Sequence, residues 1–178
     1  MPFLAARNTI RSAMAVLLTG AFASLPAAAQ DLPAPQGEVL LTIEGRIGAT
    51  NEGDTALFDD AMLSELPQQT FTTTTIWTKD REVTFSGPSL ADVLDAVDAQ
   101  GSVVRARAIN DYMVEFSRDE LTDTAPIVAN RIDGEPYGIR QNGPLWIVYP
   151  YDAGPEFQTE LVYARSIWQL VHLRIEDE

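Results

Sequence analysis

The chain has 178 residues, of which 26 are Asp or Glu and only 12 are Lys or Arg, so its formal net charge is −14 at pH 7. Such an acidic surface repels nucleic acid and anionic lipid, because binding either of them requires clustered Lys and Arg. The chain has no cysteine, which excludes disulfides, a thiolate nucleophile, iron–sulfur sites and Cys-based zinc sites.

Residues 1–29 have the pattern of a secretory signal peptide. Arg7 and Arg11 give a positive start, residues 13–22 are mostly apolar, and the alanines at 27–29 predict cleavage before Gln30. The apolar run is shorter than the roughly 20 residues of a membrane span. We therefore expect a periplasmic or secreted protein with no membrane insertion after cleavage. The mature chain would have 149 residues and a net charge of −16, from 10 basic and 26 acidic side chains.

The first part of the mature chain predicts strands on both sides of a short helix. Residues 39–47 indicate a strand of mixed alternation, followed by turn residues at 48–54. Residues 59–66 predict a helix that Pro67 ends. The β-branched residues of 70–75 favour a strand.

The clearest helix is expected after Gly87-Pro88-Ser89. Ser89 is a plausible N-cap, and Asp92 three residues later completes a capping-box-like pair. An apolar stripe follows at helical spacing, and Gly101 is expected to end the helix. The stripe consists of Leu90, Val93, Leu94 and Val97.

Several strands are predicted after residue 102. Residues 103–109 alternate like a half-buried strand, and a turn at Asn110-Asp111 leads to a partner strand at 112–116. Ser117 and Glu120 form a second capping-box candidate for a brief helix.

A second hairpin is expected at Asp133-Gly134, between strands at 127–132 and 137–139. Residues 145–149 indicate a buried strand, and 169–175 a final alternating strand in which His172 shares a face with Leu170 and Arg174. These elements predict a single α+β domain at residues 30–178, with a strand-rich, mixed, barrel-like core and short helices.

Five short motifs occur along the chain in a fixed order. They are Gly87-Pro88-Ser89-Leu90 running to Leu94, Asn110-Asp111-Tyr112, Asp133-Gly134-Glu135-Pro136, Gly143-Pro144-Leu145-Trp146 running to Pro150, and Ser166-Ile167-Trp168. In this order they resemble the molybdopterin-binding domain of sulfite-oxidase-like oxidoreductases, over about two-thirds of the mature chain. The resemblance implies that fold and makes molybdopterin a possible cofactor.

The chain departs from that family at three positions where the cofactor is held. In the family a cysteine thiolate ligates molybdenum, and Trp77 and Thr78 stand in its neighbourhood here. The arginine that follows the family's G-x-P-[LV] sequence is Trp146, and the lysine before the last tryptophan is Ile167. The sequence therefore predicts no catalytic residue and no metal ligand, and it argues against molybdenum redox chemistry.

Polar and aromatic side chains at strand ends and turns predict a ligand site. Aromatic walls with one or two arginines would suit a planar, partly anionic small molecule. The candidates are Trp77, Asn110, Asp111, Tyr112, Arg140, Trp146, Tyr149, Arg165 and Trp168. The alternative is that the rings belong to the core and that Asn110-Asp111 only makes a turn. His172, the one histidine, is interpreted as structural or solvated, because it lacks triad or metal-site partners.

Three functions are compatible with these features. The first is a binding or accessory protein that recognises a small molecule or an envelope protein, with Arg140 and Arg165 as anion anchors that replace the missing basic residues. In that case Arg140→Ala weakens ligand binding and leaves the fold intact. The second is a molybdopterin-dependent oxidoreductase that holds its cofactor without a thiolate. The third is a structural, interaction or sensing domain of an envelope signalling system.

Overall fold

The computed structural model describes residues 32–79 and 81–178, so the predicted signal peptide and its cleavage site lie outside the described residues. Within them the strands are β1 (Leu41–Gly45), β2 (Ala56–Phe58), β3 (Gln68–Thr73), β4 (Val83–Pro88), β5 (Val103–Ala108), β6 (Met113–Ser117), β7 (Ile127–Ala129), β8 (Arg131–Ile132), β9 (Trp146–Val148) and β10 (Leu170–Glu176). The α-helices are α1 (Asp60–Glu65), α2 (Leu90–Ala96) and α3 (Glu160–Arg165).

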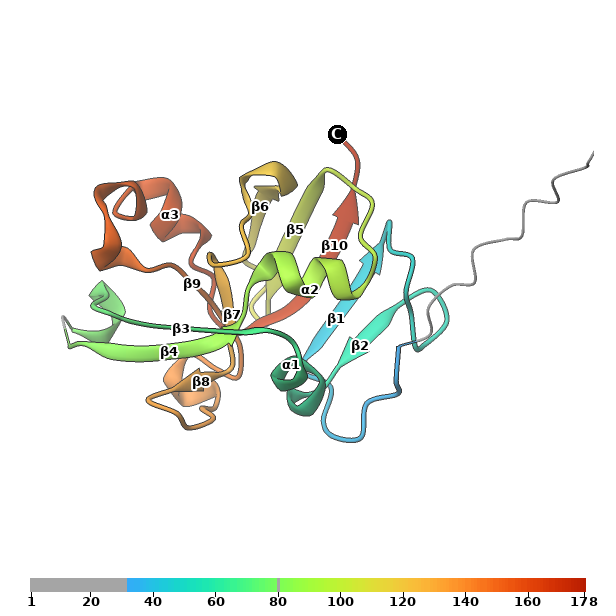
Figure 1. Ribbon diagram of the computed structural model, residues 1–178, viewed down its shortest axis with the longest axis horizontal. Coiled ribbons are helices and arrows are strands. Elements are labelled where there is room, and N and C mark those ends of the chain that lie inside the picture. The colour runs from blue at the N-terminus through green and yellow to red at the C-terminus, as the bar shows by residue number, and fades with distance from the viewer. Residues whose placement is uncertain (1–31, 80) are drawn as a thin grey trace, which may run out of the picture.

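The largest sheet has five strands in the order β2-β1-β10-β5-β6. β1 and β10 are parallel, and the other neighbouring pairs are antiparallel. Helix α2 lies across one face of this sheet (Figure 1) and buries Leu90, Val93 and Leu94 there. Charged side chains cover the other face, where Arg105 pairs with Glu115 and Glu176.

Two smaller sheets complete the fold. β3, β4 and β8 form an antiparallel sheet that extends away from the five-stranded sheet (Figure 1), and β7 pairs with β9. The resulting molecule is mixed α/β and rich in strands, with short helices, as the sequence predicts. The predicted barrel-like core is wrong, because no sheet in the described part of the chain closes on itself. Over the same residues, no helix is long and apolar enough to span a membrane.

Elements with a clear hydrophobic period or cap were predicted well. β5 and β6 form the expected hairpin, and Val104, Ala106 and Ala108 are buried as the alternation requires. The strands predicted at 39–47 and 70–75 exist as β1 and β3, shifted or shortened at their ends. The predicted strand at 145–149 contains the fully buried β9.

Helix boundaries required correction. Ser89 is the N-cap of α2 and accepts a hydrogen bond from the Asp92 N–H at 2.9 Å. Gly87, however, belongs to strand β4 rather than to the helix start. The helix ends at Ala96, before the end expected at Gly101, and Asp98 adopts a positive φ of 47° just after it. Ser117 makes no capping bond; its hydroxyl donates to Asp119 instead.

The predicted hairpin around Asp133-Gly134 is wrong beyond its turn. Asp133 and Gly134 do adopt positive φ values of 52° and 85°. The preceding segment, however, is divided between β7, which pairs with β9, and β8, which pairs with β4 in another sheet. Residues 137–139 form no strand, because the chain enters a 3₁₀ turn at Ile139–Gln141. The residues of the turn therefore determine where the chain reverses, whereas pairing with distant strands determines where β7 and β8 form.

His172 does not share a face with Leu170 as predicted. The register of β10 against β5 shifts between these two residues, which marks a β-bulge. The bulge leaves Leu170, Leu173 and Ile175 buried, while His172 lies half-buried on the charged face beside Glu44 at 3.5 Å. Burial lowers the pKa of His172.

Asp59 fastens the segment before β1 to helix α1. Its buried carboxylate accepts hydrogen bonds from the N–H groups of Met62, Gln36 and Gly37, at 2.9, 2.7 and 2.7 Å. The bond from Met62 is the N-cap bond of α1. These bonds hold the pKa of Asp59 below its ordinary value of 3.8.

We expect Asp59→Ala to lower the free energy of unfolding by about 1–3 kcal/mol at pH 7, because three N–H groups lose an acceptor. A folded-state pKa below the unfolded one stabilises the protein above about pH 4, and this stabilisation is lost as the pH falls further. The difference between the two proteins should therefore shrink in acid. Urea unfolding at pH 7 and at pH 3 measures the stability difference, with Asp54→Ala, at an exposed position, as the control. If the difference were as large at pH 3 as at pH 7, the Asp59 carboxylate would not be the group that stabilises this region.

Candidate functional site

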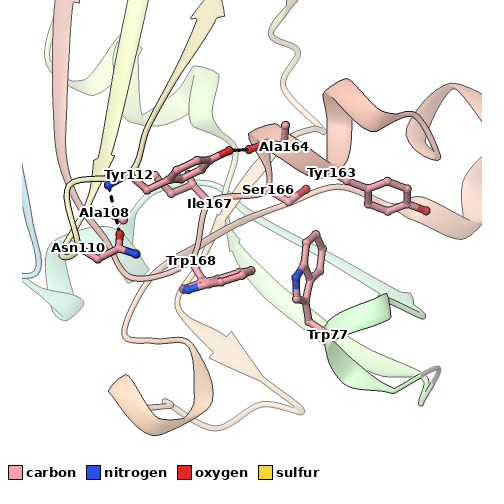
Figure 2. Close-up of a pocket in the computed structure, with 9 residues that line it drawn as sticks. All are labelled: Trp77, Ala108, Asn110, Tyr112, Tyr163, Ala164, Ser166, Ile167 and Trp168. Atoms are coloured by element: carbon pink, nitrogen blue, oxygen red, sulfur yellow. Dashed lines mark hydrogen bonds between the residues drawn. The ribbon is translucent and has the colours of Figure 1, made fainter.

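An aromatic cavity of about 220 Å³ lies between the end of the five-stranded sheet and the segment that includes α3. Figure 2 shows Asn110 and Tyr112 on one side, Trp77 and Tyr163 on the other, and Trp168 between them. The lining residues are Trp77, Ala108, Asn110, Tyr112, Tyr163, Ala164, Ser166, Ile167 and Trp168.

Trp77 is held by a 3₁₀ turn at Ile76–Thr78 that follows β3. The Thr78 N–H donates to the Thr75 hydroxyl at 2.9 Å, and the Thr75 N–H donates to the Thr78 hydroxyl at 3.1 Å. This reciprocal cap fixes the short turn that carries the indole. Trp77 contacts Trp168 and Tyr163 edge-on, with ring centroids 5.6 and 6.0 Å apart.

Tyr112 forms the opposite wall and joins the β5–β6 turn to the end of α3. The turn is closed by Asp111 at φ 63° and by the Tyr112 N–H, which donates to Asn110 Oδ1 at 3.2 Å. The Tyr112 hydroxyl donates to the Ala164 carbonyl at 3.0 Å (Figure 2). The backbone and the hydroxyl of Tyr112 are therefore both hydrogen-bonded, and these bonds hold its ring at the cavity.

A buried layer supports the cavity from beneath. Trp146 is 1% exposed, contacts Trp77 and Trp168 at 5.7 and 6.2 Å between centroids, and donates from its indole N–H to the Ser166 carbonyl at 3.3 Å. The Tyr151 hydroxyl donates to the Ser166 hydroxyl at 2.6 Å. Burial raises the pKa of Tyr151, so this phenol keeps its proton at neutral pH.

The structure brings four of the predicted site residues to the cavity: Trp77, Asn110, Tyr112 and Trp168. Trp146 is buried against Trp77 and Trp168, and Tyr149 is buried farther along the same chain segment. Asp111 points to solvent and pairs with Arg107 at 3.2 Å.

The two predicted anion anchors lie outside the cavity lining. Arg140 is exposed on the 3₁₀ turn Ile139–Gln141. Arg165 is bound to Glu120 at 2.7 Å and stacks over the Phe116 ring at 5.5 Å. Either arginine would therefore contact only a part of the ligand that extends beyond the cavity.

Sequence reasoning missed the contribution of α3. Its last turn and the residues after it supply Tyr163, Ala164, Ser166 and Ile167 to the lining. The helix could have been anticipated from Thr159, a plausible N-cap whose hydroxyl accepts from the Val162 N–H at 3.2 Å. Nothing in the sequence indicates that this short helix lies against β6.

The cavity does not fit a molybdopterin cofactor. Its volume is below the roughly 300–1,000 Å³ of sites that hold drug-sized ligands. Among the described residues that line it, none carries a charge that would hold the pterin phosphate. Across residues 32–79 and 81–178, no three His, Asp or Glu side chains gather as a metal site requires.

Comparison with known proteins assigns no family. No protein-family model matches the sequence, and no curated protein matches it at a significant level.

Proposed function

We propose that the protein is a secreted binding or accessory protein that takes a small planar molecule into the aromatic cavity. It is built on a scaffold similar to the sulfite-oxidase-like molybdopterin-binding domain, from which the cofactor chemistry has been lost. The proposal extends the first of the three functions that the sequence allows.

One observation carries the proposal. The three positions that depart from the family pattern are far apart in sequence, yet they meet at this cavity. Trp77 and Ile167 line it, and Trp146 packs beneath Trp77. Where the resemblance leads us to expect a thiolate and two cations, the cavity therefore has apolar groups. Such a replacement favours a flat apolar ligand over a metal-bearing anionic cofactor.

Polar groups around the rings define the ligand further. The side-chain amide of Asn110 uses its oxygen for the Tyr112 N–H, which leaves its NH₂ group as a donor. Within the described residues, the indole N–H groups of Trp77 and Trp168 make no hydrogen bond in the structure, so they can also donate. The matching ligand is a single planar ring system with carbonyl or ring-nitrogen acceptors.

We expect Trp168→Ala to weaken binding of such a ligand about ten-fold or more, because it removes a central aromatic wall. The measurement is native mass spectrometry of the exported chain, followed by titration with whichever planar molecule co-purifies. Met113→Ala is the matched control, since its side chain is exposed and does not line the cavity. A co-purified molecule that binds both variants equally would overturn the proposal, as would the absence of any bound molecule.

Arg140→Ala tests the anion-anchor prediction separately. If the ligand carries an acidic group beyond the cavity, the variant should bind it about three- to ten-fold more weakly, the effect of losing one exposed charge-assisted contact. Its thermal unfolding should match that of the unaltered protein, because Arg140 is exposed. A loss of folding would instead assign Arg140 a structural role.

A further inference from the structure

Among the residues that the structure describes, the longest run without a charged side chain surrounds strand β3. Residues 66–78 contain no Asp, Glu, Lys or Arg, although charged residues make up 21% of the chain. β3 is the edge strand of the β3-β4-β8 sheet, and β4 covers only one of its two sides. The strand alternates between exposed and more buried side chains along its length.

The pairing of β4 determines which backbone groups of β3 face outward. The Thr84 carbonyl accepts a hydrogen bond from the Asp133 N–H, and the Thr84 N–H donates to the Asp133 carboxylate. Both backbone groups of Thr84 therefore point away from β3. Its partner Thr72 therefore belongs to a pair without mutual backbone bonds. The 2.8 Å contact between the two threonine hydroxyls fits such a close pair.

The same alternation applies two and four residues earlier in β3, at Thr70 and Gln68. The Ser86 carbonyl accepts from the Asn130 N–H, so its partner Thr70 also directs its backbone outward. Gln68 is opposite Pro88, which has no N–H to donate. Gln68, Thr70 and Thr72 therefore present three N–H and three carbonyl groups on the open edge of β3, and none of them has a backbone partner among the described residues.

This edge lacks the usual protection against a further strand. Sheet edges are normally blocked by charged side chains, by proline within the strand or by a bulge. β3 has none of these, because its register with β4 is continuous from Gln68 to Thr73 and Pro67 lies before the strand. We propose that the outer edge of β3 binds an extended segment of a basic partner protein, which adds to the sheet as a fourth strand.

Charge selects a basic partner over a second copy of this chain. The ends of the edge carry the exposed carboxylates of Glu65 and Asp152, and Asp152 is fixed by the Thr74 N–H at 2.6 Å. Antiparallel self-pairing about Thr70 would bring the end of α1 that carries Glu65 in each copy toward the end of β3 in the other copy, near Asp152. Two chains of strongly negative charge would then repel each other where they meet. Lysines flanking a partner strand would meet these carboxylates favourably.

The test uses the mature chain and a synthetic peptide, acetyl-Lys-Thr-Val-Thr-Val-Thr-Lys-amide, followed by amide NMR spectra. We expect the largest shifts at the N–H groups of Gln68, Thr70 and Thr72. Thr70→Pro removes an outward donor without taking a bond from the β3–β4 ladder, and should weaken binding about ten-fold. Thr70→Val, which keeps the N–H and the branched side chain, should bind like the unaltered protein.

Two altered peptides complete the test. Replacing both lysines with glutamates should weaken binding, and N-methylation of alternate residues on the edge that faces β3 should abolish it. No binding of the lysine peptide, equal binding by Thr70→Pro and Thr70→Val, or shifts that arise from dimerisation of the protein alone would each overturn the proposal. Thermal unfolding of both variants verifies that their fold is retained.

Discussion

Replacing Trp146 with alanine is expected to lower the free energy of unfolding by about 3–5 kcal/mol, the range for removing a buried aromatic side chain. The ring is 1% exposed and contacts Phe85, Trp77 and Trp168, with centroids 5.5, 5.7 and 6.2 Å away. Its loss would open a void under the cavity and leave the Ser166 carbonyl without the indole donor. Urea unfolding followed by circular dichroism measures the change.

Trp146→Phe separates packing from hydrogen bonding. Phenylalanine keeps most of the apolar contact and loses only the indole N–H and part of the volume, so we expect a smaller loss of about 1–2 kcal/mol. Ligand affinity should follow the same order, because Trp77 and Trp168 rest on this ring. If Trp146→Ala left stability unchanged while it weakened binding, the residue would belong to the binding surface rather than to its support.

Gly87→Ala is expected to destabilise the fold by at least about 3 kcal/mol, at the upper end of overpacking effects. A Cβ atom at this position would lie 2.1 Å from the Val128 carbonyl oxygen and 2.8 Å from the Ala129 Cα. Both atoms belong to the backbone of β7, which lies directly against β4. This clash could be relieved only if β4 and β7 moved apart, because the atoms in contact belong to the backbone and not to a flexible side chain.

Gly138→Ala is the matched control for this variant. An added Cβ there meets no atom within 4 Å, and the φ of −100° suits any residue. Its free energy of unfolding should therefore stay within about 0.5 kcal/mol of the unaltered protein. Thermal and urea unfolding of both glycine variants give the comparison. Equal stability of the two would mean that β7 does not approach β4 as closely as the structure indicates.

The sequence by itself determined features that depend on neighbouring residues. The cap at Ser89, the alternation of 103–108 and the turn at Asn110-Asp111 each follow from local preferences of backbone and side chain. It also indicated four of the nine residues that line the cavity, because strand ends and turns are where ligand-binding side chains commonly gather. The acidic charge and the lack of cysteine likewise needed no structure.

Only the tertiary structure decided which separate segments meet. β4 was not predicted because Gly87 and Pro88 resemble a helix start, whereas the close approach of β7 explains the glycine. Arg140 and Arg165 were expected at the ligand site because they lie near its residues in sequence, yet Glu120 holds Arg165 elsewhere. Long-range pairing also divided the segment around Asn130 between two sheets. Such outcomes depend on contacts between distant residues, which local sequence patterns do not encode.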